Sequence, residues 1–355
     1  MKIGIVGRPA SGKTTLFQAL CRGQAQVSHS REPVHGVVVV PDERFDLLVR
    51  LYNPKKISPA TIDFVDDIAR LGTERSRVFS DEAMGELRTT DAITYVIDAF
   101  DSGAPDAEAV RAEAMEFLEE LSLRDLMIVE GRLERIAKQV RGPQAPAALK
   151  VEQDALEKVR EALEAGRKVS DLDLPENEAR AVAGFQLLAA KPVIFAVNVG
   201  EDHISDAPEL LGPAMSALQD AGSPAFCLSA EIEKEVAQLP EEEQAEYLAG
   251  YGIQEPVRDR LIRSVYERCR LITFFTVSEK EVHAWPLPAG STALDAADSI
   301  HSDLARGFIR AEVISWPDIR DAGGWDQAKA AGKLRLVGKE HVIEDGDCLY
   351  IRFKV

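Results

Sequence analysis

The stretch Lys2-Ile-Gly-Ile-Val-Gly-Arg-Pro-Ala-Ser-Gly-Lys-Thr-Thr15 decides the fold of this chain. An apolar run, Lys2 to Val6, leads into a G-x-x-x-x-G-K-[ST] loop over residues 7–14, and a helical stretch follows to Leu20. This order predicts a phosphate-binding loop, because the first amides of the helix and its dipole face the turn. A glycine-rich turn that only packs strand against helix would leave the lysine at this spacing unexplained.

The residues of the loop have separate expected roles. The loop backbone would surround the phosphate oxygens of a nucleotide, and Lys13 would reach the β and γ phosphates. The Thr14 hydroxyl would bind a magnesium ion that bridges those phosphates. The nucleotide-contacting residues predicted here are Arg8, Pro9, Ala10, Ser11, Gly12, Lys13, Thr14 and Thr15.

Composition indicates a globular protein of the cytoplasm. The chain has 355 residues and is 45% apolar, enough for two or three domains with a buried core. Its four cysteines show no C-x-x-C pair and no zinc spacing, so we expect reduced thiols. We find no signal-like segment and no run of about 20 apolar residues, and we therefore expect neither secretion nor membrane insertion.

The net charge of −18 argues against a protein that binds DNA or coats nucleic acid nonspecifically. Such binding depends on clustered lysine and arginine, which release counterions from the phosphate backbone. Any contact with RNA therefore has to be local.

The spacing of apolar runs predicts an α/β domain with a mostly parallel, doubly wound sheet. Helical stretches separate most of these runs, and in such folds ligands bind on loops at the carboxyl ends of the strands. The predicted strands are Lys2–Val6, Val37–Val40, Thr61–Val65, Ala92–Ala99, Pro192–Val197 and Pro224–Leu228.

Between the fourth and fifth of these strands, the pattern changes to charged, helix-forming sequence. Apolar residues spaced three and four apart form an a/d seam, and a second arm follows the break at residues 142–146. We predict two antiparallel helices in a short coiled coil, the alternative being two helices folded onto the main sheet. The seam residues are Leu126, Val129, Leu133, Ile136 and Val140, then Leu149, Leu156, Val159 and Leu163.

From Leu271 the sequence becomes rich in strands again and predicts a small α+β domain. We expect strands at 272–277, 282–286 and 348–353, a helix at 292–304, and turns at Pro286–Gly290 and Glu344–Asp347. The predicted domains are the first part of the nucleotide-binding domain (1–105), a helical insertion (106–180), the second part of the nucleotide-binding domain (181–270) and a C-terminal domain (271–355).

A magnesium site also needs a carboxylate at the end of a neighbouring strand. The run Ile62-Asp-Phe-Val-Asp-Asp67 supplies one, and the spacing leaves Asp66 and Asp67 both possible.

Recognition of the base should come from the ends of the last two strands. Asn198, Val199 and Glu201 follow one strand, and Ser229, Ala230 and Glu231 follow the next. In the N-K-x-D motif of GTPases, the aspartate accepts two guanine protons and the lysine covers the base. Here Val199 replaces the lysine, and the longer Glu201 puts the guanine contact out of register. Asn198 offers one donor and one acceptor, which suits adenine N7 and N6. We therefore expect ATP rather than GTP.

Together these residues resemble the YchF-type family of Obg-like ATPases, over nearly the whole chain. The matching motifs are the loop Gly7–Thr15, the N-x-x-E pair Asn198 and Glu201, the S-A-E run Ser229–Glu231, and C-terminal segments that include Lys280–Trp285 and Gly307–Val313. The resemblance implies a G domain with a coiled-coil insertion and a C-terminal TGS domain of β-grasp form.

The resemblance also implies an activity and partners. These are magnesium-dependent ATP binding with slow hydrolysis, and association with the ribosome or ribosomal RNA through the TGS and coiled-coil domains. The family's T-x-x-P becomes Ser30-Arg-Glu-Pro33, so Ser30 would join Thr14 and Asp67 on the metal.

The chain departs from the family pattern at the residue that follows the D-I-A run. The family's D-I-A-G reads Asp67-Ile-Ala-Arg70, and the switch at residues 73–81 contains no glycine. Arg70 could stabilise charge on the γ-phosphate, or it could lie solvated on the surface. Leu71 stands where Ras-like enzymes place the glutamine that orients water.

Two further hypotheses for the function of the chain are a scaffold that holds ATP without turnover, and a GTPase.

Overall fold

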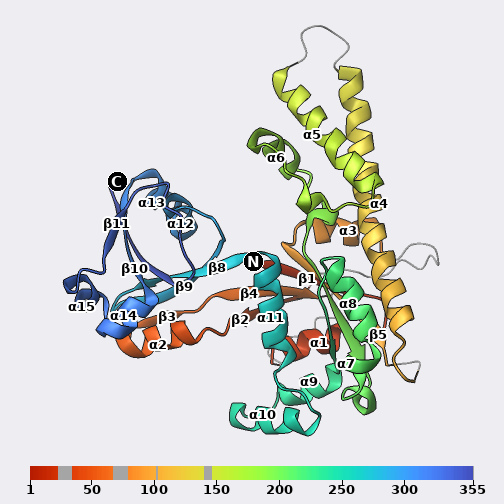
Figure 1. The fold of residues 1–355 in the computed structure, drawn as a ribbon, viewed down its shortest axis with the longest axis horizontal. Coiled ribbons are helices and arrows are strands. Elements are labelled where there is room, and N and C mark those ends of the chain that lie inside the picture. Colours follow the sequence, from red (N-terminus) through yellow and green to blue (C-terminus); the bar gives the residue numbers. More distant parts are fainter. Residues whose placement is uncertain (23–33, 67–78, 101–102, 140–145, 355) are drawn as a thin grey trace. The chain divides into compact units, whose positions relative to one another are not determined.

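A computed structural model of the chain describes residues 1–22, 34–66, 79–100, 103–139 and 146–354. Contacts between residues divide it into two compact units. The N-terminal unit consists of Met1–Gly36 and Asp63–Arg258, and the C-terminal unit consists of Val37–Ile62 and Asp259–Val355. Figure 1 labels the helices and strands of both units.

The sheet of the N-terminal unit is the mostly parallel sheet that the sequence predicts. Strand β1 pairs in parallel with β4 and β5, β5 with β6, and β6 with β7. Their carboxyl ends therefore lie at one edge, where ligands of doubly wound folds bind. In the order β2-β4-β1-β5-β6-β7, the strands are Val34–Val39, Thr61–Asp66, Lys2–Gly7, Ala92–Ala99, Val193–Val199 and Ala225–Leu228.

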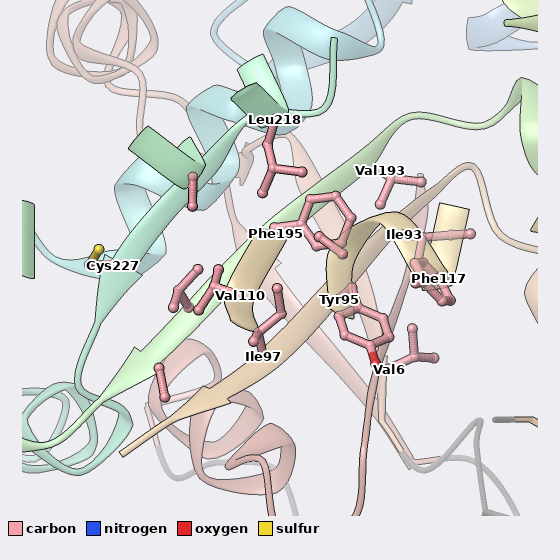
Figure 2. Packing of buried hydrophobic residues seen from close by; sticks show 14 of the residues in the cluster. Val6, Ile93, Tyr95, Ile97, Val110, Phe117, Val193, Phe195, Leu218 and Cys227 are labelled. Carbon is pink, nitrogen blue, oxygen red and sulfur yellow. The ribbon is translucent and has the colours of Figure 1, made fainter. Parts of the chain in front are cut away.

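Helices cover this sheet and bury an aromatic cluster against it. In Figure 2, Tyr95, Phe117 and Phe195 come together in the core, and the ring centroids of Tyr95 and Phe117 are 4.3 Å apart. The α-helices are α1 (Lys13–Leu20), α3 (Asp81–Arg88), α4 (Ala107–Gln139), α5 (Ala147–Glu164), α6 (Glu176–Ala183), α7 (Ala207–Leu210), α8 (Gly212–Asp220), α9 (Ala230–Val236) and α10 (Glu241–Gly250), and three short 3-10 helices are η1 (Val169–Asp171), η2 (Leu188–Ala190) and η3 (Glu201–His203).

The helical insertion combines the two arrangements that the sequence left open. The second half of α4 packs on α5 through the predicted seam, with Val129 and Ile136 buried against Leu156 and Val159. The first half of α4 instead buries Phe117 and its helical neighbours on the main sheet. The cluster between the arms also includes Leu187, so the insertion extends beyond the predicted end at residue 180. Val140 lies outside the described residues.

The C-terminal unit has a second sheet, ordered β11-β10-β12-β8-β9-β3. The predicted strands are present, and the predicted helix is broken at His301, whose side chain caps the next helix. The strands are β3 (Lys56–Ser58), β8 (Leu271–Val277), β9 (Glu281–Pro288), β10 (Phe308–Ser315), β11 (Arg335–Val337) and β12 (Asp347–Phe353). The helices are α2 (Glu43–Tyr52), α11 (Val257–Arg268), α12 (Ala293–Ile300), α13 (Ser302–Arg306), α14 (Trp316–Ala322) and α15 (Trp325–Ala330).

Two local predictions need correction. Pro286 and Pro288 belong to strand β9 and not to a turn. Strand β3 pairs with β9 at Glu281–His283. Among the described residues, no strand pairs with the outer side of β9 beside Pro286 and Pro288. Proline has no N–H to donate to a ladder, and here none is required. Strand β10 (Phe308–Ser315) is not among the strands predicted above, although its apolar pattern fits a buried strand.

The segment Val37–Ile62 was predicted to belong to the nucleotide-binding domain, but contacts group it with the C-terminal unit, although β2 is the edge strand of the first sheet. Phe45 and Leu48 of α2 are buried in one cluster with Phe275 of β8. Strand β3 adds in parallel to β9. The predicted boundary at residue 271 also differs from the division, which falls at Asp259. The cause is that the apolar face of α2 finds its partners more than 200 positions away, which no local pattern can reveal.

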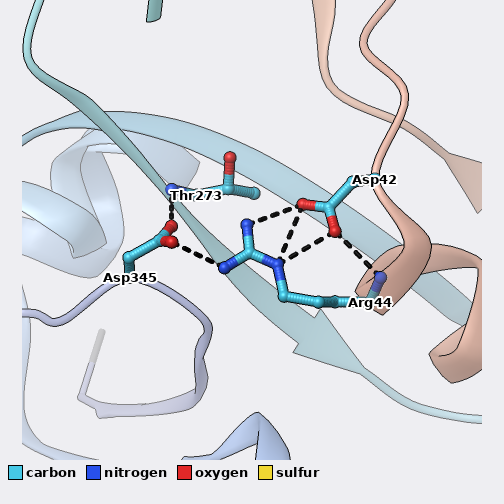
Figure 3. Close-up of polar contacts among 4 residues, drawn as sticks. All are labelled: Asp42, Arg44, Thr273 and Asp345. Carbon is cyan, nitrogen blue, oxygen red and sulfur yellow. Dashed lines mark hydrogen bonds and ion pairs between the residues drawn. The ribbon is translucent and has the colours of Figure 1, made fainter. Parts of the chain in front are cut away.

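Arg44 anchors this segment in the C-terminal unit (Figure 3). Its guanidinium donates to Asp42, the N-cap residue of α2, at 2.8 and 2.9 Å. It also pairs with Asp345 at 2.6 Å, and Asp345 accepts from the Thr273 amide of β8 at 2.8 Å. The two carboxylates raise the pKa of Arg44, and they outweigh the opposing effect of burial. Arg44 therefore joins α2 to the loop before β12.

Replacing Arg44 with methionine should lower the free energy of unfolding of the C-terminal unit by about 2 kcal/mol, because Asp345 loses its partner while the apolar stem is kept. All three tryptophans lie in this unit, so their fluorescence during urea unfolding reports on it. The control is Arg306→Met, which removes an exposed ion pair with Asp303 and should change stability by less than about 0.5 kcal/mol. Equal changes in both variants would contradict the anchoring role.

Candidate functional site

The loop between β1 and α1 presents its backbone at the carboxyl edge of the sheet. Arg8, Pro9 and Ala10 are exposed, whereas Ser11 is buried. Gly12 is the N-cap residue of α1 with φ 92°, in the left-handed region that favours glycine. A Cβ on Gly12 would lie 2.2 Å from Nδ2 of Asn198, so no larger residue fits. This is the close, amide-lined turn that phosphate binding requires.

The Lys13 ammonium lies across this loop. Its Nζ donates to the carbonyl oxygen of Arg8 at 2.6 Å, which folds the side chain back over the turn. Thr14 is exposed in the first turn of α1, and Thr15 is half-buried. A phosphate seated on the loop would meet the Lys13 ammonium on one side and the α1 amides on the other.

Asp66 ends the neighbouring strand β4 and is 4% exposed. Burial, and after it the negative charge of Asp66, raises the pKa of the Cys21 thiol to about 11. Asp66 therefore places a carboxylate at the carboxyl end of the strand that pairs with β1. Ser30, Asp67 and Arg70 lie outside the described residues, so their roles stay predictions.

Asn198 ties the phosphate loop to the loop after β7. Its Nδ2 donates to the Ser11 carbonyl at 3.0 Å, and its Oδ1 accepts from the Ala230 amide at 2.9 Å. The residue is 6% exposed. The sequence treats Asn198 mainly as a reader of the base, and the structure gives it a structural role first. One N–H and one lone pair of the amide are left over for a ligand.

The other residues predicted for base binding differ in their placement. Val199 is 1% exposed and its side chain packs in the core of the sheet, so a contact with the base through that side chain is not available. Ser229 and Ala230 are buried where α9 begins. Glu201 is exposed in η3, and Glu231 is exposed beside Lys234 at 3.4 Å. Among these residues, a direct hydrogen bond joins the Ala230 amide to the Asn198 side chain.

An ion-pair network beside the loop was not foreseen from the sequence. The two terminal nitrogens of Arg8 pair with Glu113 at 3.2 Å and with Glu116 at 2.8 Å, both on α4. Glu113 also accepts from the buried Tyr95 hydroxyl at 3.0 Å. Burial raises the pKa of Glu113, and the positive charge of Arg8 opposes that shift. Glu113 is one of 60 acidic residues, and no sequence pattern distinguishes it.

Outside the loop, the described part of the chain offers few other sites. Within it, no three His, Cys, Asp or Glu side chains are grouped so that they could hold a metal ion. No helix in the same residues has the length and apolar character needed to cross a membrane. All four cysteines are free thiols, as expected.

Gly12→Ala should weaken nucleotide binding at least tenfold, because the methyl group displaces Asn198 and the backbone is strained at this φ. We expect unfolding to become easier by about 2 kcal/mol as well. Gly131→Ala in α4 is the control, because a Cβ there meets nothing within 4 Å. Calorimetric titration with ATP and GTP checks both variants. Unchanged affinity in the Gly12 variant would contradict the proposed fit.

Two family models match the chain. YchF-GTPase_C, described as "Protein of unknown function (DUF933)", matches residues 271–354. MMR_HSR1, described as "50S ribosome-binding GTPase", matches residues 2–130. The second match covers the phosphate loop and strands β1 to β5, in agreement with the P-loop G domain fold.

Curated relatives match from end to end. The chain is 36% identical over 364 residues to "Ribosome-binding ATPase YchF" of Pasteurella multocida, covering 100% of this chain and 99% of that protein. It is 32% identical over 367 residues to "Obg-like ATPase 1" of Oryza sativa, covering 100% and 92%.

A solved structure shows the same fold. The chain superposes on the structure of the Schizosaccharomyces pombe YchF GTPase with a TM-score of 0.82 and 30% sequence identity, covering 99% of this chain and 97% of that one. The phosphate loop, the Asn198 tether and the two-unit fold are thus found in a chain that belongs to the YchF family of P-loop proteins.

Proposed function

We propose that this chain is a magnesium-dependent ATPase that hydrolyses ATP slowly and associates with the ribosome in a nucleotide-dependent manner. The observation that carries the proposal is the phosphate loop, with Lys13 folded across it and Asn198 holding it to the loop after β7. The names of the curated relatives, which describe ribosome-binding ATPases, support the same activity.

Lys13 and the loop backbone would hold the phosphates, and the exposed Thr14 hydroxyl would bind magnesium. The Asp66 carboxylate fits the same ion from β4, with Ser30 and Asp67 as further proposed ligands. A bound magnesium ion would neutralise charge on the β and γ phosphates. We propose slow turnover because the switch at residues 73–81 contains no glycine. Lys13 and Arg70 are the side chains that we propose for charge stabilisation.

The base is proposed to be adenine. Asn198 keeps one N–H and one lone pair after its two contacts within the protein, which is enough for N7 and N6 of adenine. Glu201 and Glu231, both exposed, and the buried pair Ser229 and Ala230 complete the proposed base site. A glutamate in place of the aspartate of N-x-x-D disfavours guanine.

The partner is proposed to be the ribosome or its RNA, with the cytoplasm as the place of action. The contacting parts would be the helical arm and the C-terminal unit, which we propose to be a TGS domain. Leu123 and Met127 on α4 are exposed apolar side chains one helical turn apart, consistent with a contact surface on the arm.

Calorimetry with ATP and GTP in the presence of magnesium, followed by phosphate release, tests the proposal. We expect tighter binding of ATP, slow release of phosphate, and about a hundredfold slower release in Lys13→Ala, because the variant loses the cation on the β and γ phosphates. ATP binding without release would make the chain a nucleotide-loaded scaffold. Tighter binding of GTP would contradict the assignment of Asn198 and Glu201.

A further inference from the structure

The side chain of Arg8 reaches helix α4, while its backbone carbonyl oxygen accepts from Lys13. Its guanidinium lies between two carboxylates of α4, Glu113 and Glu116. The carboxylates are thus separated from the phosphate loop by no more than one arginine side chain. Negative charge from α4 therefore lies close to the place where negative phosphates would bind.

Glu113 is held where it is. Its side chain is 11% exposed, and it accepts from the hydroxyl of Tyr95, which is packed in the aromatic core. Glu116, by contrast, is more than half exposed and can turn into solvent. A fixed, poorly hydrated carboxylate repels other anions more strongly than a solvated one, because the local dielectric constant is lower. Without a counter-charge, Glu113 would oppose the binding of phosphates.

We propose that Arg8 is a positioning residue for nucleotide binding, which neutralises Glu113 beside the phosphate loop without itself contacting the phosphates. The inference rests on the proposed function, because it assumes that a nucleotide occupies the loop. It concerns the phosphates alone, so it holds for ATP and GTP alike. Neither the P-loop pattern nor the family motif specifies the residue at this position.

A double-mutant cycle separates this role from direct phosphate binding. Arg8→Ala should weaken nucleotide binding about tenfold, since it exposes the phosphates to an unpaired Glu113. Glu113→Gln alone should leave the affinity unchanged or slightly tighter. The double variant should recover most of the lost affinity, since the repelling charge is gone. Calorimetry gives the dissociation constants of all three variants.

The pH dependence gives a second test. The charged and titratable groups around Glu113 are Arg8 on the loop, Tyr95 and Asp98 on β5, and Glu116 on α4. Arg8 lowers the pKa of Glu113, so Arg8→Ala raises it. Below that raised pKa, Glu113 is protonated and uncharged, and the ratio of wild-type to Arg8→Ala affinity should approach one. The ratio should grow as pH rises, and Glu113→Gln should abolish this dependence.

The matched control is the Arg132–Glu152 pair, which joins α4 to α5 in the helical arm at 2.6 Å. Arg132→Ala and Arg132→Ala/Glu152→Gln should leave nucleotide affinity as in wild type. Equal weakening in Arg8→Ala and in its double variant with Glu113→Gln would overturn the proposal, because it would mean direct phosphate contact or damage to the loop. A tenfold loss in Glu113→Gln alone would also overturn it, even if Arg8→Ala does not fold.

Failure of this inference can be told apart from failure of the proposed function. If the wild type prefers GTP, or binds ATP without turnover, the proposed function fails, and the affinity cycle is run with the nucleotide that binds more tightly. A titration of the Glu113 carboxyl by nuclear magnetic resonance needs no nucleotide. Its pKa should be higher in Arg8→Ala than in wild type, and an unchanged value would overturn the proposal.

Discussion

The two hydrogen bonds of the Asn198 side chain hold the candidate site together. Strands β1, β6 and β7 end at the same edge of the sheet, but the loops after them have no ladder to fix them to one another. The Asn198 amide connects the Ser11 carbonyl of the first loop with the Ala230 amide of the last. Buried polar groups are costly when unpaired, so each contact depends on the other being made. Gly12 is required at this point because the amide occupies the space of a side chain.

Helix α4 links the phosphate loop to the helical arm. In its first half, Glu113 pairs with Arg8 and Phe117 fills the aromatic core, and in its second half Val129 packs between the arms. Where the helix leaves the sheet, the fully buried Asp125 pairs with Arg88 of α3 at 2.8 Å and accepts from the Ala189 amide. A buried ion pair adds geometric definition more than net stability, so this junction would fix the direction in which the arm leaves the sheet. Helix α4 thus contacts Arg8 of the phosphate loop and carries the arm.

Much of this architecture could be predicted from local patterns. The apolar runs locate the parallel strands, and the seam through Val129 and Ile136 locates the coiled coil, because burial follows the period of each element. The sequence places Val37–Ile62 in the nucleotide-binding domain, whereas its contacts group it with the C-terminal unit. The apolar face of helix α2 shows that the helix packs on a partner, but it does not identify that partner. The same limit explains the Arg8–Glu113 pair and the Asn198 tether, which join residues far apart in the sequence. Val199 is part of the N-x-x-E motif, but strand alternation turns its side chain into the core. A motif position therefore does not by itself identify a side-chain contact with a ligand.

We propose that this edge of the sheet is one nucleotide site held together by the two hydrogen bonds of Asn198. A crystal structure with magnesium and a non-hydrolysable ATP analogue tests this proposal most directly. We expect phosphates on residues 7–14 within contact of Lys13, with the adenine beside Asn198 and Ala230 and both Asn198 hydrogen bonds intact. A nucleotide bound elsewhere, or an Asn198 side chain that releases Ser11 or Ala230 on binding, would contradict it.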